Sequence, residues 1–313
     1  MFRSIWDDVK REYSYGNMVT RIIIINLAFF VIVKLLWVFL MIGNAWVEPE
    51  IYRTISRFFM ISSDWMHNLT HPWVIFTHMF FHEGVFHILW NMLFLYWFGR
   101  IVGDLLGNHR VLPLYLLGGL VGGLIYLITA KLIFNGTSYA LGASGAVMAI
   151  VVAAGTTSPD YIMRLILLGD IKLKYIVGAL VFFDVVGMGS NINTGGHIAH
   201  LGGAFFGWLF VRQLREGNDL SMPVNKLLNR IQEFFKGLSG GGGRSTRSRK
   251  GPKVVYRNPN RKKSTHTRGN ASSDYNDMSH QEQLDSILEK IKKSGYDNLT
   301  EEEKEFLFNA SKK

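Results

Sequence analysis

The sequence predicts an all-α membrane protein: a six-transmembrane-helix bundle with a cytoplasmic, partly disordered C-terminal tail that ends in a small helical hairpin. Two observations lead to this prediction. Long apolar runs follow one another between Met18 and Phe210, after which the chain becomes polar and basic. Charged residues make up 19% of the 313 residues and are concentrated outside those runs, which is typical of a chain that crosses a bilayer several times.

The composition limits the chemistry and the partners. The chain has no cysteine, so disulfide and thiolate chemistry are excluded. Its net charge of +10 comes largely from the tail, and beside membrane spans such a tail indicates attraction to lipid headgroups, not nucleic-acid binding. The acidic N-terminus leads directly into an apolar run that has no small-residue cleavage site. This pattern predicts an uncleaved first span.

Six segments have the composition of membrane spans. The first contains Lys34, and the second begins only after the break at His82–Gly84. The fourth is short, so its start is expected to lie below the membrane surface. The predicted spans are Val19–Ile42, Val85–Arg100, Val111–Phe134, Leu141–Ala154, Tyr175–Met188 and Gly196–Val211. The amphipathic piece Tyr161–Leu168 is a candidate helical extension of the fifth span.

Basic residues set the expected orientation. One set of loops contains only Arg53 and Arg57, both in the long aromatic connection over residues 43–75. The other set is rich in basic residues, namely Arg3, Lys10, Arg11, Arg100, Arg110, Arg164, Lys172, Lys174, Arg212 and Arg215. The positive-inside rule therefore predicts six crossings with both termini in the cytoplasm. Ser144 then lies near the outer end of its span.

The chain divides by composition into five expected parts. Residues 1–18 form a cytoplasmic N-terminus and residues 19–213 form the six-helix core. Residues 214–238 carry an apolar face among basic and amide side chains, which predicts an interfacial helix. Residues 239–273 are rich in glycine, serine and basic side chains, which predicts a disordered linker. Residues 274–313 resemble two short capped helices, which rarely fold alone at this size. They are expected to dock on a cytoplasmic partner, and the alternative is a weakly ordered appendage that aids membrane attachment.

Polar residues in three spans are candidates for one functional site. Ser144 opens the fourth span within Gly142-Ala143-Ser144-Gly145, His200 lies early in the sixth, and His82, His87 and Asn91 lie at the start of the second. Ionisable groups inside a membrane are costly, so several at one depth indicate function. A hydroxyl, a base and hydrogen-bond donors are what nucleophilic catalysis requires.

The spacing supports a meeting of these helices. His200, Gly203 and Gly207 lie on one helical face at i, i+3 and i+7, so this face can approach the small residues of the fourth span closely. His87 and Asn91 share a face at i, i+4. His82 does not lie on that face and is expected in the preceding turn.

These motifs together resemble the rhomboid family of intramembrane serine proteases. Gly142-Ala143-Ser144-Gly145 is similar to the family's Gly-x-Ser-Gly motif. His82, His87 and Asn91 match its His-x4-His-x3-Asn pattern in the second span. The stretch from Ala199 to Gly203, with Gly207, matches its catalytic-histidine helix. The resemblance covers residues 15–215 and implies a rhomboid-like bundle.

The resemblance implies hydrolysis of peptide bonds in or next to transmembrane segments of membrane-protein substrates. Ser144 would be the nucleophile and His200 the general base, as a dyad without a carboxylate partner and without a cofactor. The Ser144 N–H, His87 and Asn91 would stabilise the oxyanion, with His82 in support. The glycines of these motifs, Gly142, Gly145 and Gly203, would have supporting roles.

Two positions depart from the family pattern. The family often has Trp-Arg before the second span, whereas this chain has Trp73-Val74. Some members have a tyrosine four residues after the nucleophile that packs on the catalytic histidine. This chain has Met148 there, so support for His200 must come from a different contact.

Alternatives remain for several residues and for the function. His197 is a rival to His200 one turn earlier, and Asp184 is expected to be a polar contact with a proton-relay role open. A metal site from His82, His87 and His200 is disfavoured, since it leaves Ser144 and Asn91 unexplained. A transporter and a non-catalytic, rhomboid-like protein that binds membrane clients are the rival functions. A bacterial inner (plasma) membrane is the expected location, because no organelle-targeting peptide is recognisable.

Overall fold

The computed structural model describes residues 2–133, 136–165, 169–190, 193–238, 280–294 and 299–310. The chain divides into two compact units, Met1–Gly242 and Gly243–Lys313, and each is described by itself. The linker predicted over residues 239–273 lies outside the described residues.

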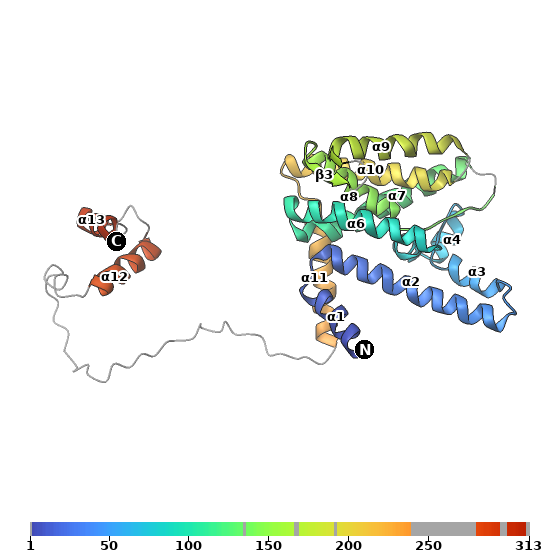
Figure 1. The fold of residues 1–313 in the computed structure, drawn as a ribbon, viewed down its shortest axis with the longest axis horizontal. Helices are drawn as coiled ribbons and strands as arrows, with labels where there is room; N and C mark the ends of the chain where they lie inside the picture. Colours follow the sequence, from blue (N-terminus) through green and yellow to red (C-terminus); the bar gives the residue numbers. More distant parts are fainter. Residues whose placement is uncertain are drawn as a thin grey trace. The chain divides into compact units, whose positions relative to one another are not determined.

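The first unit is mostly helical (Figure 1). Short 3-10 helices occupy His78–Phe80, Asn108–Arg110 and Met188–Ser190. Its α-helices are α1 (Phe2–Tyr15), α2 (Met18–Gly43), α3 (Glu50–Arg57), α4 (Trp65–Thr70), α5 (Val74–Thr77), α6 (Val85–Leu106), α7 (Val111–Ile133), α8 (Ser144–Thr157), α9 (Leu173–Gly187), α10 (Thr194–Arg215) and α11 (Ser221–Leu238).

Among the described residues, three helical segments are long and apolar enough to cross a membrane. They are Met18–Gly43, Val85–Leu106 and Asn108–Ala130, the last of which contains most of α7. The apolar helix α8 is shorter. The prediction of a predominantly helical membrane protein is therefore confirmed.

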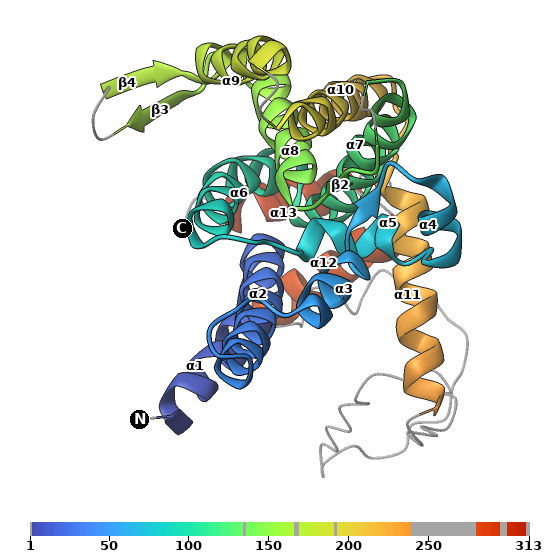
Figure 2. The same cartoon turned by 90° about the vertical axis from the view of Figure 1, so that its right-hand side faces the viewer.

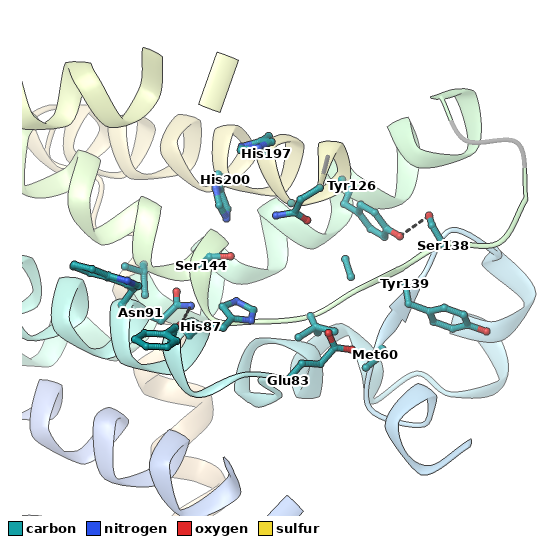
Figure 3. Close-up of a pocket in the computed structure, with 18 of the residues that line it drawn as sticks. Met60, Glu83, His87, Asn91, Tyr126, Ser138, Tyr139, Ser144, His197 and His200 are labelled. Carbon is teal, nitrogen blue, oxygen red and sulfur yellow. Dashed lines mark hydrogen bonds between the residues drawn. The ribbon is translucent and has the colours of Figure 1, made fainter. Parts of the chain in front are cut away.

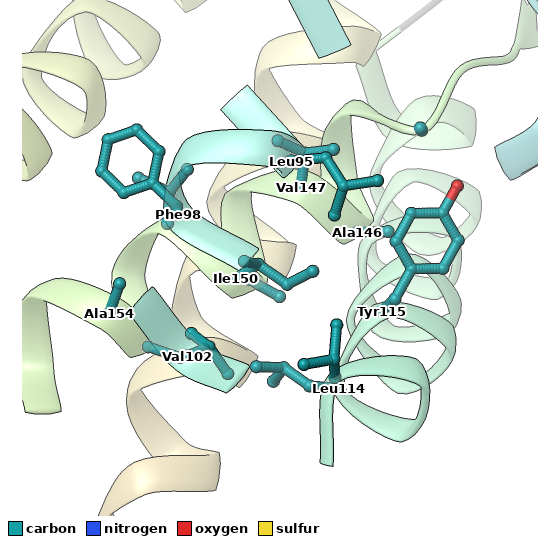
Figure 4. Close-up of a cluster of buried hydrophobic side chains, with 14 of the residues drawn as sticks. Leu95, Phe98, Val102, Leu114, Tyr115, Ala146, Val147, Ile150 and Ala154 are labelled. Atoms are coloured by element: carbon teal, nitrogen blue, oxygen red, sulfur yellow. The ribbon is translucent and has the colours of Figure 1, made fainter. Parts of the chain in front are cut away.

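Helix α8 lies at the centre of the bundle, beside α6, α7, α9 and α10 (Figures 1 and 2). Every residue from Gly145 to Gly155 is buried. Figure 4 shows how α6, α7 and α8 meet in an apolar core. The core side chains labelled there are Leu95, Phe98 and Val102 of α6, Leu114 and Tyr115 of α7, and Ala146, Val147, Ile150 and Ala154 of α8.

Small residues bring α7, α8 and α10 to backbone contact. A Cβ atom on Gly203 would overlap the Gly145 carbonyl oxygen, and one on Gly207 would overlap that of Ala149. On α7, a Cβ on Gly122 would lie 2.6 Å from the Ala199 carbonyl oxygen. Such glycine contacts allow helices to pack closely by van der Waals attraction. They fix the beginning of α8 against the histidine-bearing part of α10.

The candidate helical extension over Tyr161–Leu168 is wrong. Strand β3 (Ile162–Leu165) pairs antiparallel with β4 (Gly169–Lys172). The Arg164 side chain bonds to Asp170 across the two strands, with Nε–Oδ1 at 2.8 Å, and Gly169 adopts a φ of +76°. A glycine with positive φ and opposite charges across the pair favour a hairpin over a helix.

A second small sheet lies on the side of the molecule where α8 begins. Strand β1 (Ile61–Ser62) pairs antiparallel with β2 (Tyr139–Ala140), with Ile61 opposite Ala140. The hydroxyls of Tyr126 and Ser138 lie 2.9 Å apart, and the Ser138 N–H donates to Ser63 Oγ at 2.9 Å. The residues that lead into Ser144 are therefore tied both to the long first loop and to α7.

Helix α11 crosses the direction of the bundle helices (Figure 1). The residues just before α11 and just before α7 are joined by an ion pair between Asp219 Oδ2 and Arg110 Nη2, 2.8 Å apart. Several large apolar side chains on α11 are exposed, including Leu227, Ile231, Phe234 and Phe235.

The described part of the second unit contains α12 (His280–Ser294) and α13 (Glu301–Ala310). The Thr300 N–H donates to Glu303 Oε2 at 2.8 Å, and the Glu303 N–H donates to Thr300 Oγ1 at 3.3 Å. This reciprocal pair is a capping box at the start of α13. Lys290 Nζ of α12 lies 2.7 Å from Glu303 Oε2 and joins the two helices.

Candidate active site

A cavity of about 1370 Å³ opens at the start of α8. Figure 3 shows the polar side chains that reach it from three helices: His87 and Asn91 from α6, Ser144 from α8, and His197 and His200 from α10. Asp184 of α9 also lines it. The cavity therefore brings together Ser144, His200, His87 and Asn91, which the sequence placed on three separate spans.

The turn before Ser144 is held by two hydrogen bonds. The Gly142 N–H donates to the His78 carbonyl oxygen at 2.8 Å, and the Ala143 N–H donates to His82 Nε2 at 3.3 Å. His82 is buried, and its Nδ1 lies 3.3 Å from the Phe80 carbonyl oxygen. With Nδ1 as donor and Nε2 as acceptor, both bonds fit one neutral tautomer. His82 thus anchors the turn through its bond to the Ala143 N–H.

Gly142 is required by its backbone and by its surroundings. Its φ of +109° is rarely adopted by residues with a side chain. An added Cβ would lie 2.7 Å from His87 Nε2 and 3.8 Å from Ser144 Oγ. The His87 ring and the Ser144 hydroxyl therefore approach the same point above Gly142.

Hydrogen-bond donors converge at this point. Ser144 is the first residue of α8, and the first N–H groups of an α-helix have no acceptor within it. The helix dipole adds a partial positive charge at the same end. Asn91 Nδ2 donates one hydrogen to the His87 carbonyl oxygen at 2.8 Å, and its amide carries a second. The Ser144 N–H, His87 and Asn91 are thus donors of the kind that stabilise an oxyanion.

His200 is held by a carboxylate. Its Nδ1 lies 2.7 Å from Asp184 Oδ1, and Asp184 is only 7% exposed. Because an ionised carboxylate only accepts hydrogen bonds, Nδ1 carries the proton and Nε2 keeps its lone pair. Figure 3 shows the ring pointing from α10 toward Ser144. In this tautomer His200 is ready to accept a proton.

The expectation of a histidine without a carboxylate partner is therefore wrong for this geometry. Asp184 lies on α9, and nothing in the sequence relates its position to that of His200 on α10. The available signal was an acid inside an apolar helix, where ionisable groups mark functional sites. His197 also bonds to Asp184 Oδ1 through its Nδ1, at 2.8 Å. The aspartate is thus shared by the two histidines that the sequence treated as rivals.

The two departures from the family pattern have structural counterparts. Trp73 Nε1 donates to the Phe58 carbonyl oxygen at 2.8 Å, which anchors the first loop without an arginine. Met148 packs in a small apolar cluster with Val152 and Ala204. The different contact that supports His200 is its bond to Asp184.

Comparison with known families identifies the protein class. A model of the rhomboid domain matches residues 69–216, which include every residue of the candidate site. Residues 69–216 therefore form a domain of the rhomboid family. A family of unknown function matches residues 274–313, the region that the sequence divides off as a C-terminal module.

Individual relatives are similar over about half of the chain or somewhat more. The zebrafish (Danio rerio) presenilin-associated rhomboid-like protein A, mitochondrial, is 29% identical over 204 residues, covering 63% of this chain and 51% of the relative. Rhomboid protein 1, mitochondrial, of Saccharomyces cerevisiae is 26% identical, covering 53% and 47%. Rhomboid-like protein 11, chloroplastic, of Arabidopsis thaliana is 27% identical, covering 50% and 57%. The chain thus spans about half the length of these curated relatives.

These names correct the predicted location. The relatives are mitochondrial or chloroplastic proteins, so the expectation of a bacterial inner (plasma) membrane is wrong. That expectation rested on the lack of a recognisable targeting peptide. The apolar spans and loop charges that a helical bundle needs are the same in any membrane, so they do not indicate in which membrane the protein resides. A multi-pass membrane protein remains the supported description.

Proposed function

We propose that the protein is an intramembrane serine endopeptidase, which cleaves membrane proteins in or next to their transmembrane segments. One observation carries the proposal: Ser144 starts α8 inside the cavity that His200 lines, and His200 is fixed by Asp184 through Nδ1. A hydroxyl, an oriented base and a group of N–H donors in one cavity are the groups that acyl transfer by a nucleophilic serine requires.

In the proposed reaction, Ser144 Oγ attacks the carbonyl carbon of the scissile peptide while His200 Nε2 takes the hydroxyl proton. The negative charge on the carbonyl oxygen is stabilised by the Ser144 N–H, His87 and Asn91. His200 then gives the proton to the leaving amine as the C–N bond breaks. Water, activated by the same base, hydrolyses the acyl-enzyme and restores Ser144.

We propose six crossings for the core, formed by α2, α6, α7, α8, α9 and α10. Helix α8 has 14 residues, so it is about 21 Å long, shorter than the roughly 30 Å hydrocarbon core. If its C-terminal end reaches one interface, Ser144 lies beneath the other. An even number of crossings puts the segments before α2 and after α10 on the same side of the membrane.

The remaining parts of the chain are assigned supporting roles. The exposed apolar side chains of α11 are proposed to rest on the lipid surface, within an interfacial segment over residues 214–238. Residues 1–18 precede the core at 19–213, residues 239–273 connect it to the module at 274–313, and this module is proposed to dock on a soluble partner.

The test is cleavage of a single-span model substrate by the purified chain in liposomes. Wild type is expected to cleave and Ser144→Ala to be inactive, with its melting temperature unchanged. Ser138→Ala is the matched control, because Ser138 lines the same cavity and its variant should still cleave. Cleavage by Ser144→Ala would overturn the proposal. A non-catalytic client-binding protein would instead bind the substrate equally well with and without the Ser144 hydroxyl.

A further inference from the structure

We propose that Asp184, His197 and His200 form a binding site for a divalent transition metal of the zinc class, and that the bound metal holds the protease inactive. The second half of this inference rests on the proposed function, whereas the first half does not. It starts from a feature that the reaction leaves unused: a second histidine, His197, bonded to the same carboxylate oxygen as the proposed base.

The three side chains already have the arrangement of a ligand set. His197 and His200 are three residues apart on α10 and therefore lie on one face, and Asp184 meets them from α9. One ligand atom from each residue lies within 4.8 Å of the other two. Ligands around a tetrahedral zinc ion are about 3.3 Å apart, given Zn–N bonds of about 2.0–2.1 Å. Small side-chain rotations would bring all three onto one ion.

The donor atoms select the class of metal. Two imidazole nitrogens and one carboxylate are ligands for zinc, cobalt or nickel, whereas magnesium and calcium prefer sites made of oxygen. Three protein ligands leave a fourth position for water, and the cavity gives it access because all three residues line it. The Asp184 carboxylate offsets part of the metal charge.

His197 is held in place for this role. A Cβ atom on Gly187 would lie 2.5 Å from both Cε1 and Nε2 of His197, so the ring packs directly on the backbone near the end of α9. With its Nδ1 on Asp184, the ring has a fixed direction. Pre-orientation of ligands lowers the cost of metal binding.

Metal binding at Nδ1 would remove the base. Without metal, the His200 proton is on Nδ1 and the Nε2 lone pair is free. With metal on the Nδ1 lone pair, a neutral imidazole must carry its proton on Nε2. The proton moves from one nitrogen to the other through solvent, with no net release. Nε2 then cannot accept the Ser144 proton, so inhibition is reversed when a chelator removes the metal.

The binding test uses the full chain in detergent without a polyhistidine tag, titrated with zinc by calorimetry. Wild type is expected to bind one zinc ion at this site, and His197→Gln to weaken that binding at least tenfold. His67→Gln is the matched control, because His67 and His71 stack with ring centroids 4.6 Å apart and offer a second histidine pair. Equal zinc affinity in wild type and His197→Gln, or a loss confined to His67→Gln, would overturn the site.

The activity test uses cleavage of the model substrate with increasing zinc and then with chelator. With each variant compared with its own rate without zinc, His197→Gln is expected to need at least tenfold more zinc than wild type for half inhibition. Zinc that binds at the site without slowing wild type would overturn the regulatory half. If no variant cleaves at all, the proposed function fails, while the calorimetry still decides whether the metal site exists.

Discussion

Helices α8 and α9 follow each other in the chain, are nearly equal in length and are both apolar, but they are held very differently. Helix α8 is buried without a break from Gly145 to Gly155. On α9 only Leu173 and Asp184 are buried, and large side chains such as Phe182 and Phe183 are exposed. In the proposed six-crossing core these exposed side chains would face lipid.

The difference shows that Ser144 and His200, the two central residues of the candidate site, are held in place by different kinds of contact. Ser144 is fixed by a helix that glycine contacts clamp between α7 and α10. His200 depends on a carboxylate from a peripheral helix that has few other buried residues. We therefore expect substitutions in the clamp to affect the whole site, and substitutions at Asp184 to affect the base alone.

The largest effect is expected from Gly203→Ala. Its Cβ would overlap the Gly145 carbonyl oxygen, so α8 and α10 must separate, which costs about 1–3 kcal/mol in a packed core. Because Ser144 and His200 move apart, cleavage should fall about 10³-fold or more. The measurements are the cleavage rate and the melting temperature.

The matched control for the clamp is Gly178→Ala on α9. An added Cβ there meets nothing within 4 Å, and alanine favours a helix by about 1 kcal/mol over glycine. This variant should therefore melt no lower than wild type and cleave normally. Equal losses in Gly178→Ala and Gly203→Ala would contradict the contrast between the two helices.

The next largest effect is expected from Asn91→Ala on α6. It removes one proposed oxyanion donor and should lower kcat about 10²–10³-fold. The cavity and the glycine clamp remain, so the melting temperature should change little. Steady-state kinetics with the model substrate make the measurement. A rise in KM with unchanged kcat would show that Asn91 only binds substrate.

A smaller effect is expected from Asp184→Asn. Without the carboxylate the Nδ1 tautomer of His200 is no longer enforced, and kcat should fall about 10²-fold, the low end of a general base's contribution. KM should stay constant, because Asp184 acts through His200. Asp160→Asn is the control, since Asp160 pairs with Lys172 and Lys174 near the other end of α9. A change in KM alone would contradict the positioning role.

The smallest effect is expected from Asp219→Asn, which alters stability and not chemistry. Burial alone would raise the pKa of Asp219, but hydrogen bonds from Arg110 and Ser221 outweigh it and hold that pKa below its ordinary value of 3.8. The ionised pair thus stabilises the fold above about pH 4, and this contribution is lost as the pH falls through the lowered pKa.

We therefore expect Asp219→Asn to melt about 2–4 °C below wild type at pH 7, for a pair contributing about 1 kcal/mol. The difference should vanish in acid, and cleavage at pH 7 should be unchanged. The measurement is thermal unfolding at pH 7 and at a series of lower pH values, continued below 3.8 until the melting temperatures stop converging. A gap that persists at the lowest pH would show that the effect does not come from the ionised pair.

The sequence was informative where one helix carries its own signal. The apolar runs and the break at Gly84 placed α2, α6 and α7 to within a few residues of their start points, because burial in lipid imposes hydrophobicity on the whole length of a span. The motifs placed Ser144 and His200 on separate helices, because each motif lies within one helix. Periodicity and small residues were enough to suggest that these two helices touch.

The specific side-chain contacts between helices could not be predicted from the sequence. No spacing relates Asp184 of α9 to His200 of α10, since the length and course of the connection between them are set by tertiary packing. The β3–β4 hairpin was missed because its alternation is brief and the local charges also suit an amphipathic helix. In both cases a contact distant in sequence overrides the local pattern.

The central claim, that His200 activates Ser144, is tested most directly by labelling the folded protein with a fluorophosphonate. This reagent bonds to an activated serine oxygen with loss of fluoride, so it reads nucleophilicity without any substrate. We expect one label on wild type, located at Ser144 by peptide mass spectrometry, and none on Ser144→Ala or His200→Ala. A label on another residue, or undiminished labelling of Ser144 in His200→Ala, would contradict the claim.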